Sequence, residues 1–214
     1  MTWRGWQRPW RGSFPDLKEK EKMYNPYAIG EKIYLRALRQ EDVAGPWHEW
    51  FSDEEITKHL GGREFPNTME KQQAFYEAAV NSCTDVVLAV VDKATDKHIG
   101  VVSLRKIDWV HRHADIAVVI GNKEFWKSGT SGLEAYTLAI KTAFQRLNLE
   151  NLIGGYLAGY KSVEKLMELL QFREVGRYKG LCAIDGKRED VVVVQLCRDD
   201  WLKRSGGKPG KKAG

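Results

Sequence analysis

Apolar residues along this chain fall into two patterns, short runs and segments with helical spacing. The run ADIAVVI at residues 114–120 is short and rich in β-branched residues, which is typical of a buried strand. The segment at 133–147 repeats apolar residues every three or four positions and predicts a helix. The same patterns predict strands at 32–38, 85–92, 98–108, 114–120, 152–158, 177–184 and 188–197, and helices at 39–51, 69–82, 133–147 and 162–170.

The order of these elements indicates the fold class. A strand is followed by two helices, three strands, a helix, a strand, a helix and two strands, which predicts an α+β (mixed α/β) layered fold and not a doubly wound sheet. Local signals support the boundaries. Pro46 starts or breaks the first helix, Thr68 caps the second, and Asp185-Gly186 forms the turn of the last hairpin.

The loop KSGTSG joins the strand at 114–120 to the helix that follows it. The first turn of a helix has backbone N–H groups without intrahelical partners and carries partial positive charge. Glycines let this backbone approach an anion and hydroxyls add donors, so the loop is a candidate phosphate-binding site, with ordinary helix capping as the alternative. The candidate residues are Lys127, Ser128, Gly129, Thr130, Ser131 and Gly132.

The length of the chain, 214 residues and 24.5 kDa, fits one domain with tails. We expect a flexible N-terminal extension at 1–22, one domain at 23–203 and a basic flexible tail at 204–214. The Lys/Glu alternation directly before Met23 is what a translated ribosome-binding site would encode, so we hypothesise that Met23 is the true start.

The net charge of +5 comes from the two ends of the chain. Residues 1–12 carry three basic side chains and residues 203–214 carry five, with no acid in either segment. These charges together exceed the net excess, so the part between is slightly acidic. Nucleic-acid binding by the domain is therefore not expected.

The hydropathy of the chain and the positions of its cysteines indicate the cellular compartment. No apolar run approaches the roughly 20 residues of a membrane span. The start lacks an apolar signal core, so we expect a cytoplasmic protein with no membrane partner. The cysteines Cys83, Cys182 and Cys197 form neither a metal pattern nor an evident disulfide framework, which fits a reducing compartment.

Several segments, in order, resemble one family, the GNAT superfamily of N-acetyltransferases. They resemble in particular its branch of ribosomal-protein N-terminal and spermidine acetyltransferases. The resemblance implies a central, mostly antiparallel sheet of about seven strands flanked by about four helices. The matching segments are KIYLRALRQEDV, IGVVSLRKIDWVHRHADIAVVIGNKEFW, LEAYTLAIKTAFQRLNLENL and SVEKLMELLQFREVGRYKG.

The resemblance also implies acetyl-CoA as cosubstrate, with its pyrophosphate on the loop KSGTSG. The family pattern is Arg/Gln-x-x-Gly-x-Gly/Ala, whereas this loop is one residue longer and carries Thr or Ser at one glycine position. Such loops bind through backbone N–H groups, so the hydroxyl residues can still serve. By the same resemblance the pantetheine arm lies along Val118, Val119 and Ile120 like an added strand.

The later helix departs from the family pattern. Members often carry an Asn before it and a Tyr inside it, and that Tyr protonates the leaving thiolate. Here Met167 stands at the Tyr, Gly159 or Tyr160 at the Asn, and Gln171 at a glycine. A thiolate leaves fairly well without protonation, so this loss slows acetyl transfer without forbidding it.

Acyl transfer from a thioester needs a neutral amine and a donor to the carbonyl oxygen. The candidate donor is a backbone N–H at Val118 or Val119. The candidate base is Asp115, where the resembling sequences carry Glu, with His111 and His113 as alternatives.

Each of these residues also has a structural interpretation. Asp115 could pair with Arg105 or Arg112 at the strand end, and the histidines could belong to an exposed turn. Glu54 and Glu55 could recognise a cationic amine or remain solvated at the surface. Four aromatic residues are expected in the core or a cleft wall: Trp47, Trp50, Phe125 and Trp126.

Together these observations predict an acetyl-CoA-dependent N-acetyltransferase. We expect direct attack in a ternary complex, because no cysteine sits in a recognisable nucleophile setting. The acceptor is a primary amine, on a polyamine, an amino sugar or a protein N-terminus, and a homodimer stays open. The alternative is a non-catalytic acyl-CoA-binding relative that acts as a sensor or partner-binding module.

Overall fold

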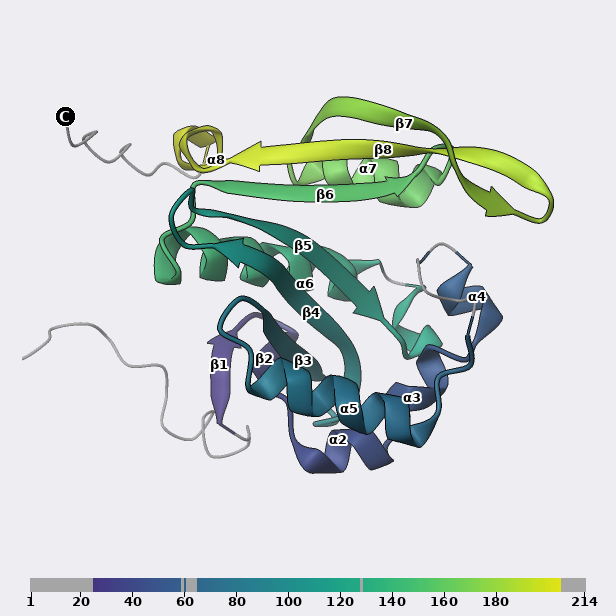
Figure 1. The fold of residues 1–214 in the computed structure, drawn as a ribbon. Helices are drawn as coiled ribbons and strands as arrows, with labels where there is room; N and C mark the ends of the chain where they lie inside the picture. Colours follow the sequence, from purple (N-terminus) through teal and green to yellow (C-terminus); the bar gives the residue numbers. More distant parts are fainter. Residues whose placement is uncertain (1–24, 59, 61–64, 128, 205–214) are drawn as a thin grey trace, which may run out of the picture.

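The computed structural model of the protein describes residues 25–58, 60, 65–127 and 129–204. At its centre lies one sheet with the strand order β1-β2-β3-β4-β5-β6-β8-β7 (Figure 1). Neighbouring strands are antiparallel except β5 and β6, which are parallel. The strands are β1 (Pro26–Ile29), β2 (Ile33–Ala37), β3 (Val86–Asp92), β4 (His98–Asp108), β5 (His113–Ile120), β6 (Asn151–Leu157), β7 (Arg173–Ile184) and β8 (Lys187–Cys197).

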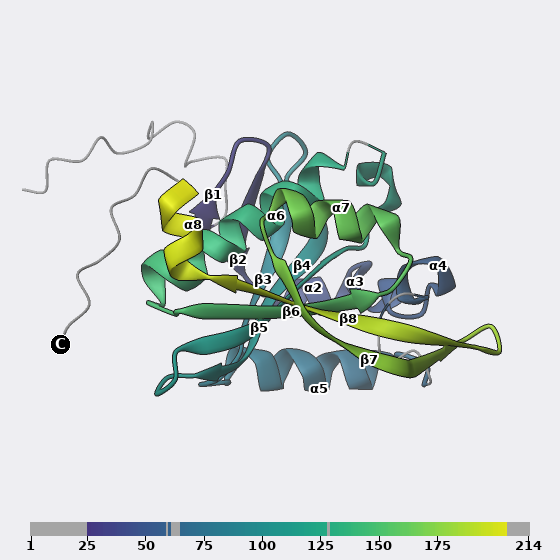
Figure 2. The same cartoon turned by 90° about the horizontal axis from the view of Figure 1, so that it is seen from above.

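Helices cover both faces of this sheet, with α6 and α7 on one face and α5 on the other (Figure 2). The predicted α+β fold is therefore confirmed. The helices are α2 (Gln40–Ala44), α3 (Trp47–Trp50), α4 (Glu54–Thr57), α5 (Met69–Val80), α6 (Thr130–Lys141), α7 (Lys161–Leu169) and α8 (Arg198–Arg204), with a 3₁₀ turn η1 (Lys123–Phe125) and a π-helical turn η2 (Thr142–Arg146). None of the helices in the described part of the chain has the length and apolar character needed to cross a membrane.

Each face of the sheet carries its own apolar cluster. The larger cluster joins the sheet to α6 and includes Ile116, Leu138 and Phe144, while the smaller one includes the buried Trp47 and Trp50 of α3. Along β5 the side chains alternate between the two clusters, as the period of a strand requires. Even-numbered residues from 114 to 120 pack on the larger cluster, and Val119 packs on the smaller one.

The predicted first helix is broken in two at Gly45 and Pro46. α2 ends at Ala44, and Pro46 is the N-cap of α3. Proline cannot donate a backbone hydrogen bond within a helix, which explains the break. The predicted N-cap of α5 is confirmed, because the Thr68 side chain accepts a hydrogen bond from the Lys71 N–H.

A buried ion pair anchors α2 to β2. The Arg36 guanidinium donates two hydrogen bonds of 2.7 Å to the Asp42 carboxylate, and the two side chains are only 2% and 3% exposed. Burial alone would raise the pKa of Asp42, but hydrogen bonding to Arg36, together with His98, holds this pKa well below its usual range. The carboxylate therefore stays charged at neutral pH.

Several elements differ from the sequence prediction. β1 adds an edge strand, α8 follows β8, and α6 begins at Thr130, earlier than the apolar pattern indicated. These elements are short or polar, so periodicity could not show them. The predicted extension at 1–22 and the tail beyond residue 204 lie outside the described residues.

Candidate active site

β5 and β6 separate soon after they meet. Their parallel pairing covers only His113–Asp115 on β5 and Asn151–Ile153 on β6. Beyond these residues β6 continues alongside β8, while β5 turns away with β4 (Figure 1). Within the described chain no strand pairs with the β6-facing edge of residues 116–120, so the backbone groups on this edge face an opening in the sheet.

The direction of the backbone groups alternates along β5. Gly121, just after the strand, donates its N–H to the carbonyl of Ile99 on β4 over 2.9 Å. Every second residue of an antiparallel pair bonds the same neighbour, so the N–H of Val119 also faces β4 and that of Val118 faces the opening. In agreement, the N–H of Val118 donates a hydrogen bond to the hydroxyl of Tyr136 on α6.

Tyr136 therefore places a hydroxyl on the open edge of β5. Its ring packs against the larger apolar cluster. Burial raises the pKa of Tyr136 to about 12, and the hydrogen bond from Val118 offsets this only in part, so the phenol is protonated at neutral pH. Sequence reasoning missed this residue, because Tyr136 reads there only as an apolar position of a helix.

The first turn of α6 lies beside the end of β5. A Cβ atom on Gly132 would lie 3.9 Å from the Ile120 side chain. The N-cap is Gly129, whose φ of 62° favours glycine, and it has no side chain to cap the helix. The first turn also contains no acid. This helix N-terminus therefore offers N–H donors and partial positive charge to an anion.

The predicted loop residues are only partly brought together. Thr130, Ser131 and Gly132 form the first turn of α6, with Ser131 just 4% exposed. Lys127 is exposed to solvent. Ser128 lies outside the described residues.

Two side chains fix the loop and its helix in place. The indole N–H of Trp126 donates to the carbonyl of Ile120 over 2.7 Å, which ties the loop to the end of β5. The Glu134 carboxylate accepts the backbone N–H of Lys32 over 3.1 Å, which ties α6 to the turn before β2. Glu134 is thus engaged in a structural contact with that turn.

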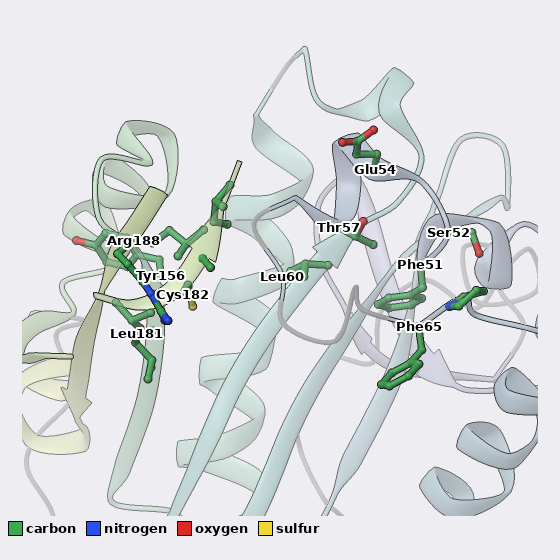
Figure 3. A pocket seen from close by; sticks show the side chains of 16 residues that line it. Phe51, Ser52, Glu54, Thr57, Leu60, Phe65, Tyr156, Leu181, Cys182 and Arg188 are labelled. Atoms are coloured by element: carbon green, nitrogen blue, oxygen red, sulfur yellow. The ribbon is translucent and has the colours of Figure 1, made fainter. Parts of the chain in front are cut away.

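A cleft of about 1050 Å³ lies beside the diverging half of β6 (Figure 3). Residues 155–157 of β6 and the β7–β8 hairpin form one wall. Side chains in and around α4 line the opposite side together with Phe65 and Pro66, namely Phe51, Ser52, Glu54, Thr57 and Leu60. An ion pair joins the two sides, since Lys58 Nζ lies 3.1 Å from Asp185 Oδ2 at the hairpin turn.

The predicted base, Asp115, lies at the apex of the opening. It is the last β5 residue that pairs with β6. Its Oδ2 lies 3.1 Å from Lys106 Nζ, so its ion-pair partner is Lys106 and neither of the two predicted arginines. Asp115 is not among the residues that line the cleft.

The two predicted histidines lie at the other end of β5, away from the opening. His111 is exposed in the β4–β5 turn, where its backbone N–H donates to Asp108 Oδ1 over 2.6 Å. His113 begins β5, with its Nε2 3.9 Å from Asp108 Oδ2. The backbone hydrogen bond from His111 also lowers the pKa of Asp108. This geometry agrees with the structural interpretation of His111 as an exposed turn residue, whereas His113 is a half-buried residue at the start of β5.

The remaining candidate residues differ in whether they line the cleft. Glu54 lines the cleft, whereas Glu55 is bound to Lys123, with Oε2 and Nζ 2.6 Å apart. Cys182 also lines the cleft, a position that its sequence context did not indicate. Met167, which stands at the family's tyrosine, is only 4% exposed and packs in the larger cluster.

Comparison with known proteins identifies the family. Residues 32–173 match the family model of the acetyltransferase (GNAT) domain. A search of curated proteins finds no match.

Solved structures share the fold. A spermidine N-acetyltransferase from Vibrio cholerae in complex with CoA and spermine has a TM-score of 0.74 and 22% identity, over 80% of this chain and 98% of that one. A probable acetyltransferase has a TM-score of 0.70 and 22% identity, over 80% of this chain and 96% of that one. A dodecameric structure of the Vibrio cholerae enzyme has a TM-score of 0.69 and 22% identity, over 81% of this chain and 98% of that one.

The resemblance seen in the sequence is thereby confirmed. The family match covers the sheet from β2 to β6, the opening between β5 and β6 and the loop at the start of α6. The chain belongs to the GNAT acetyltransferases, and it is an N-acetyltransferase that uses acetyl-CoA as its cosubstrate to acetylate an amine.

Proposed function

We propose that this chain acetylates a primary amine by direct attack of the amine on bound acetyl-CoA, in a ternary complex. The observation that supports this most is the opening between β5 and β6, where the backbone N–H of Val118 faces away from β4. The N-terminus of α6 lies beside the end of β5, and the cleft lies beside β6.

The first turn of α6 and the open edge of β5 fit a CoA molecule. The N-terminus of α6 would hold the pyrophosphate, because Gly129 leaves open space around it and the first turn carries no acid to repel phosphate. The open edge of residues 116–120 would pair with the amides of the pantetheine arm as an added strand does. Bound there, acetyl-CoA supplies the acetyl group as a thioester.

Val118 is the proposed donor to the carbonyl oxygen of the acetyl group. Its N–H faces the opening, whereas that of Val119 faces β4. A fixed backbone donor stabilises the negative charge that grows on this oxygen during attack. To act in this way, Val118 must exchange the Tyr136 hydroxyl for the carbonyl of the cosubstrate.

In the transfer, a C–N bond forms and a C–S bond breaks, and the amine gives up one proton. Asp115 at the apex of the opening is the proposed acceptor of this proton. Its Oδ2 lies 3.1 Å from Lys106 Nζ. Asp115→Asn should lower kcat/KM, whereas Asp108→Asn in the neighbouring turn should leave it unchanged.

Calorimetric titration with acetyl-CoA and with CoA, followed by a thiol-release assay over a panel of amines, tests the proposal. We expect micromolar binding and thiol release with at least one class of primary amine. The non-catalytic alternative, which the buried Met167 favours, predicts binding without release from any amine. Absence of binding would contradict both. The cytoplasmic location and the homodimer stay predictions.

A further inference from the structure

The walls of the cleft are mainly apolar. Phe51, Leu60 and Phe65 line one side, and Leu181 lines the other (Figure 3). Leu157 of β6 and Val191 of β8 also line the cleft. Phe65 is 73% exposed and Leu181 is 55% exposed, so much of their apolar surface remains in contact with water. A ligand that covered these side chains would remove that surface from water, which favours binding of an apolar group.

Few charged side chains line the described part of the cleft. Among the cleft residues that the structure describes, Glu54 brings the one carboxylate, and Arg188 brings a guanidinium. A polyamine carries several ammonium groups, and each one placed against an apolar wall without a counter-charge loses hydration free energy.

Some nearby carboxylates are paired with lysines. Lys123 Nζ lies 2.8 Å from Asp53 Oδ2 and 2.6 Å from Glu55 Oε2, so one ammonium group faces two carboxylates. Asp185 at the hairpin turn is bound to Lys58 over 3.1 Å. The negative charge beside α4 is therefore reduced by these lysines and not cancelled.

We infer that the acceptor is a primary amine joined to an apolar group, aromatic or branched aliphatic. The amine would point to the opening at Val118, and the apolar group would rest between Phe65 and Leu181. This inference rests on the proposed function and names its acceptor class. A cleft of about 1050 Å³ is at the upper end of small-molecule pockets, so it has room for a free amine or for the first residues of a peptide.

The test compares matched acceptors in the thiol-release assay with the full chain and acetyl-CoA. Phenylethylamine and isoamylamine are set against ethanolamine and spermidine, and peptides beginning with Phe or Leu are set against the same peptides beginning with Gly. We expect kcat/KM at least about tenfold higher for each apolar member. The ratio of kcat/KM for the best peptide to kcat/KM for the best free amine shows whether the acceptor is a peptide N-terminus or a free amine.

Two variants on one strand make the test specific. Leu181 and Val175 both lie on β7 and are 55% and 56% exposed, but only Leu181 lines the cleft. Leu181→Ser should lower kcat/KM for the apolar acceptors about tenfold while the Kd of CoA stays unchanged. Val175→Ser should change neither quantity.

A variant of Glu54, the carboxylate in the cleft, tests the inference from the charged side. Glu54→Gln should leave the preference for apolar acceptors in place, because that preference does not depend on Glu54. Higher kcat/KM for spermidine than for every apolar amine, lost in Glu54→Gln, would overturn the inference while leaving acetyl transfer itself established. Failure of the proposed function would look different, since no amine would then release thiol.

A readout without turnover uses Cys182, which lines the cleft, and Cys83, which is exposed elsewhere. Phenylethylamine should slow alkylation of Cys182 and not of Cys83, and spermidine at the same concentration should slow neither. Protection of Cys182 by spermidine alone would contradict the inference.

Discussion

The two sides of the opening between β5 and β6 are built from different parts of the chain. The proposed cofactor side consists of backbone groups, namely the edge of β5 at Val118 and the first turn of α6 after Gly129. The proposed acceptor side consists of side chains, such as Phe65 and Leu181, from segments that are distant in the sequence. Backbone recognition tolerates changes of side chain, whereas recognition by side chains changes with each substitution. The cofactor can thus be inferred from the family, and the acceptor must be inferred from this chain.

The largest expected effect is on stability, at the buried ion pair between β2 and α2. Asp42→Asn should lower the free energy of unfolding by about 3–5 kcal/mol, because Arg36 is then left buried without its counter-charge. Denaturant unfolding measures this change. Glu41→Gln is the matched control, since Glu41 is 77% exposed and lies 3.9 Å from Arg39, and it should change stability little.

The same pair predicts a pH dependence of stability. The folded-state pKa of Asp42 lies below its usual value, so its contribution is fully present above about pH 4 and is lost as the pH falls further. In the wild type the free energy of unfolding should drop below about pH 4, and Asp42→Asn should show a smaller drop. Equal slopes for the two proteins would contradict this role of the pair.

Next in size is a change on the cofactor side. Gly129→Asp puts a carboxylate at the N-terminus of α6, at a positive φ that costs some stability but that Asp adopts more readily than most residues. Repulsion of the pyrophosphate should raise the Kd of CoA about tenfold to a hundredfold.

Gly159→Asp is the control for this variant. Gly159 also has a positive φ, 84°, with no atom within 4 Å of an added Cβ, and it precedes α7. Its substitution should leave CoA binding unchanged in the same titration. Equal Kd values of CoA for Gly129→Asp and the wild type would contradict the assignment of the pyrophosphate to the N-terminus of α6.

A smaller effect is expected at the edge of β5. Tyr136→Phe removes the hydroxyl that accepts the N–H of Val118, so acetyl-CoA no longer competes with it. Binding should become tighter by about twofold to tenfold, the worth of one hydrogen bond. Tyr156→Phe, on β6 and in the cleft, should not change the Kd. Weaker binding by Tyr136→Phe would show that the hydroxyl instead contacts the cosubstrate.

The smallest effect is expected at Cys182. Under the proposed direct attack of the amine, Cys182→Ala should keep kcat within about twofold of the wild type. A loss of activity with acetyl-CoA binding intact, together with an acetylated Cys182 in the wild type by mass spectrometry, would indicate a covalent intermediate.

The elements that carry the proposed cofactor side could be predicted from the sequence because they are local. Strand 114–120, the glycine loop and the next helix follow one another, so periodicity and turn residues place them together. The direction of a single N–H, at Val118 and not at Val119, depends on register with β4. The pairing of Asp115 with Lys106 likewise depends on the irregular β4–β5 pairing, which no local pattern shows.

The acceptor side could not be predicted in the same way. Phe65 lies in a loop and Leu181 lies on an exposed part of β7. They line one cleft because the tertiary structure brings these two distant segments to the same opening. Glu54 and Glu55 are neighbours in the sequence, yet only Glu54 lines the cleft, since Lys123 binds Glu55. Such distinctions come from tertiary contacts, which composition and spacing do not contain.

Hydrogen–deuterium exchange of the protein, with CoA alone and with phenylethylamine alone, tests most directly that the two sides bind different chemistry. CoA should slow exchange in peptides that cover residues 116–120 and 129–133, and leave residues 181–184 unchanged. Phenylethylamine should slow exchange at 181–184 and leave the first two segments unchanged. Protection of 181–184 by CoA, with none at 116–120, would contradict the assignment of the cofactor to the edge of β5.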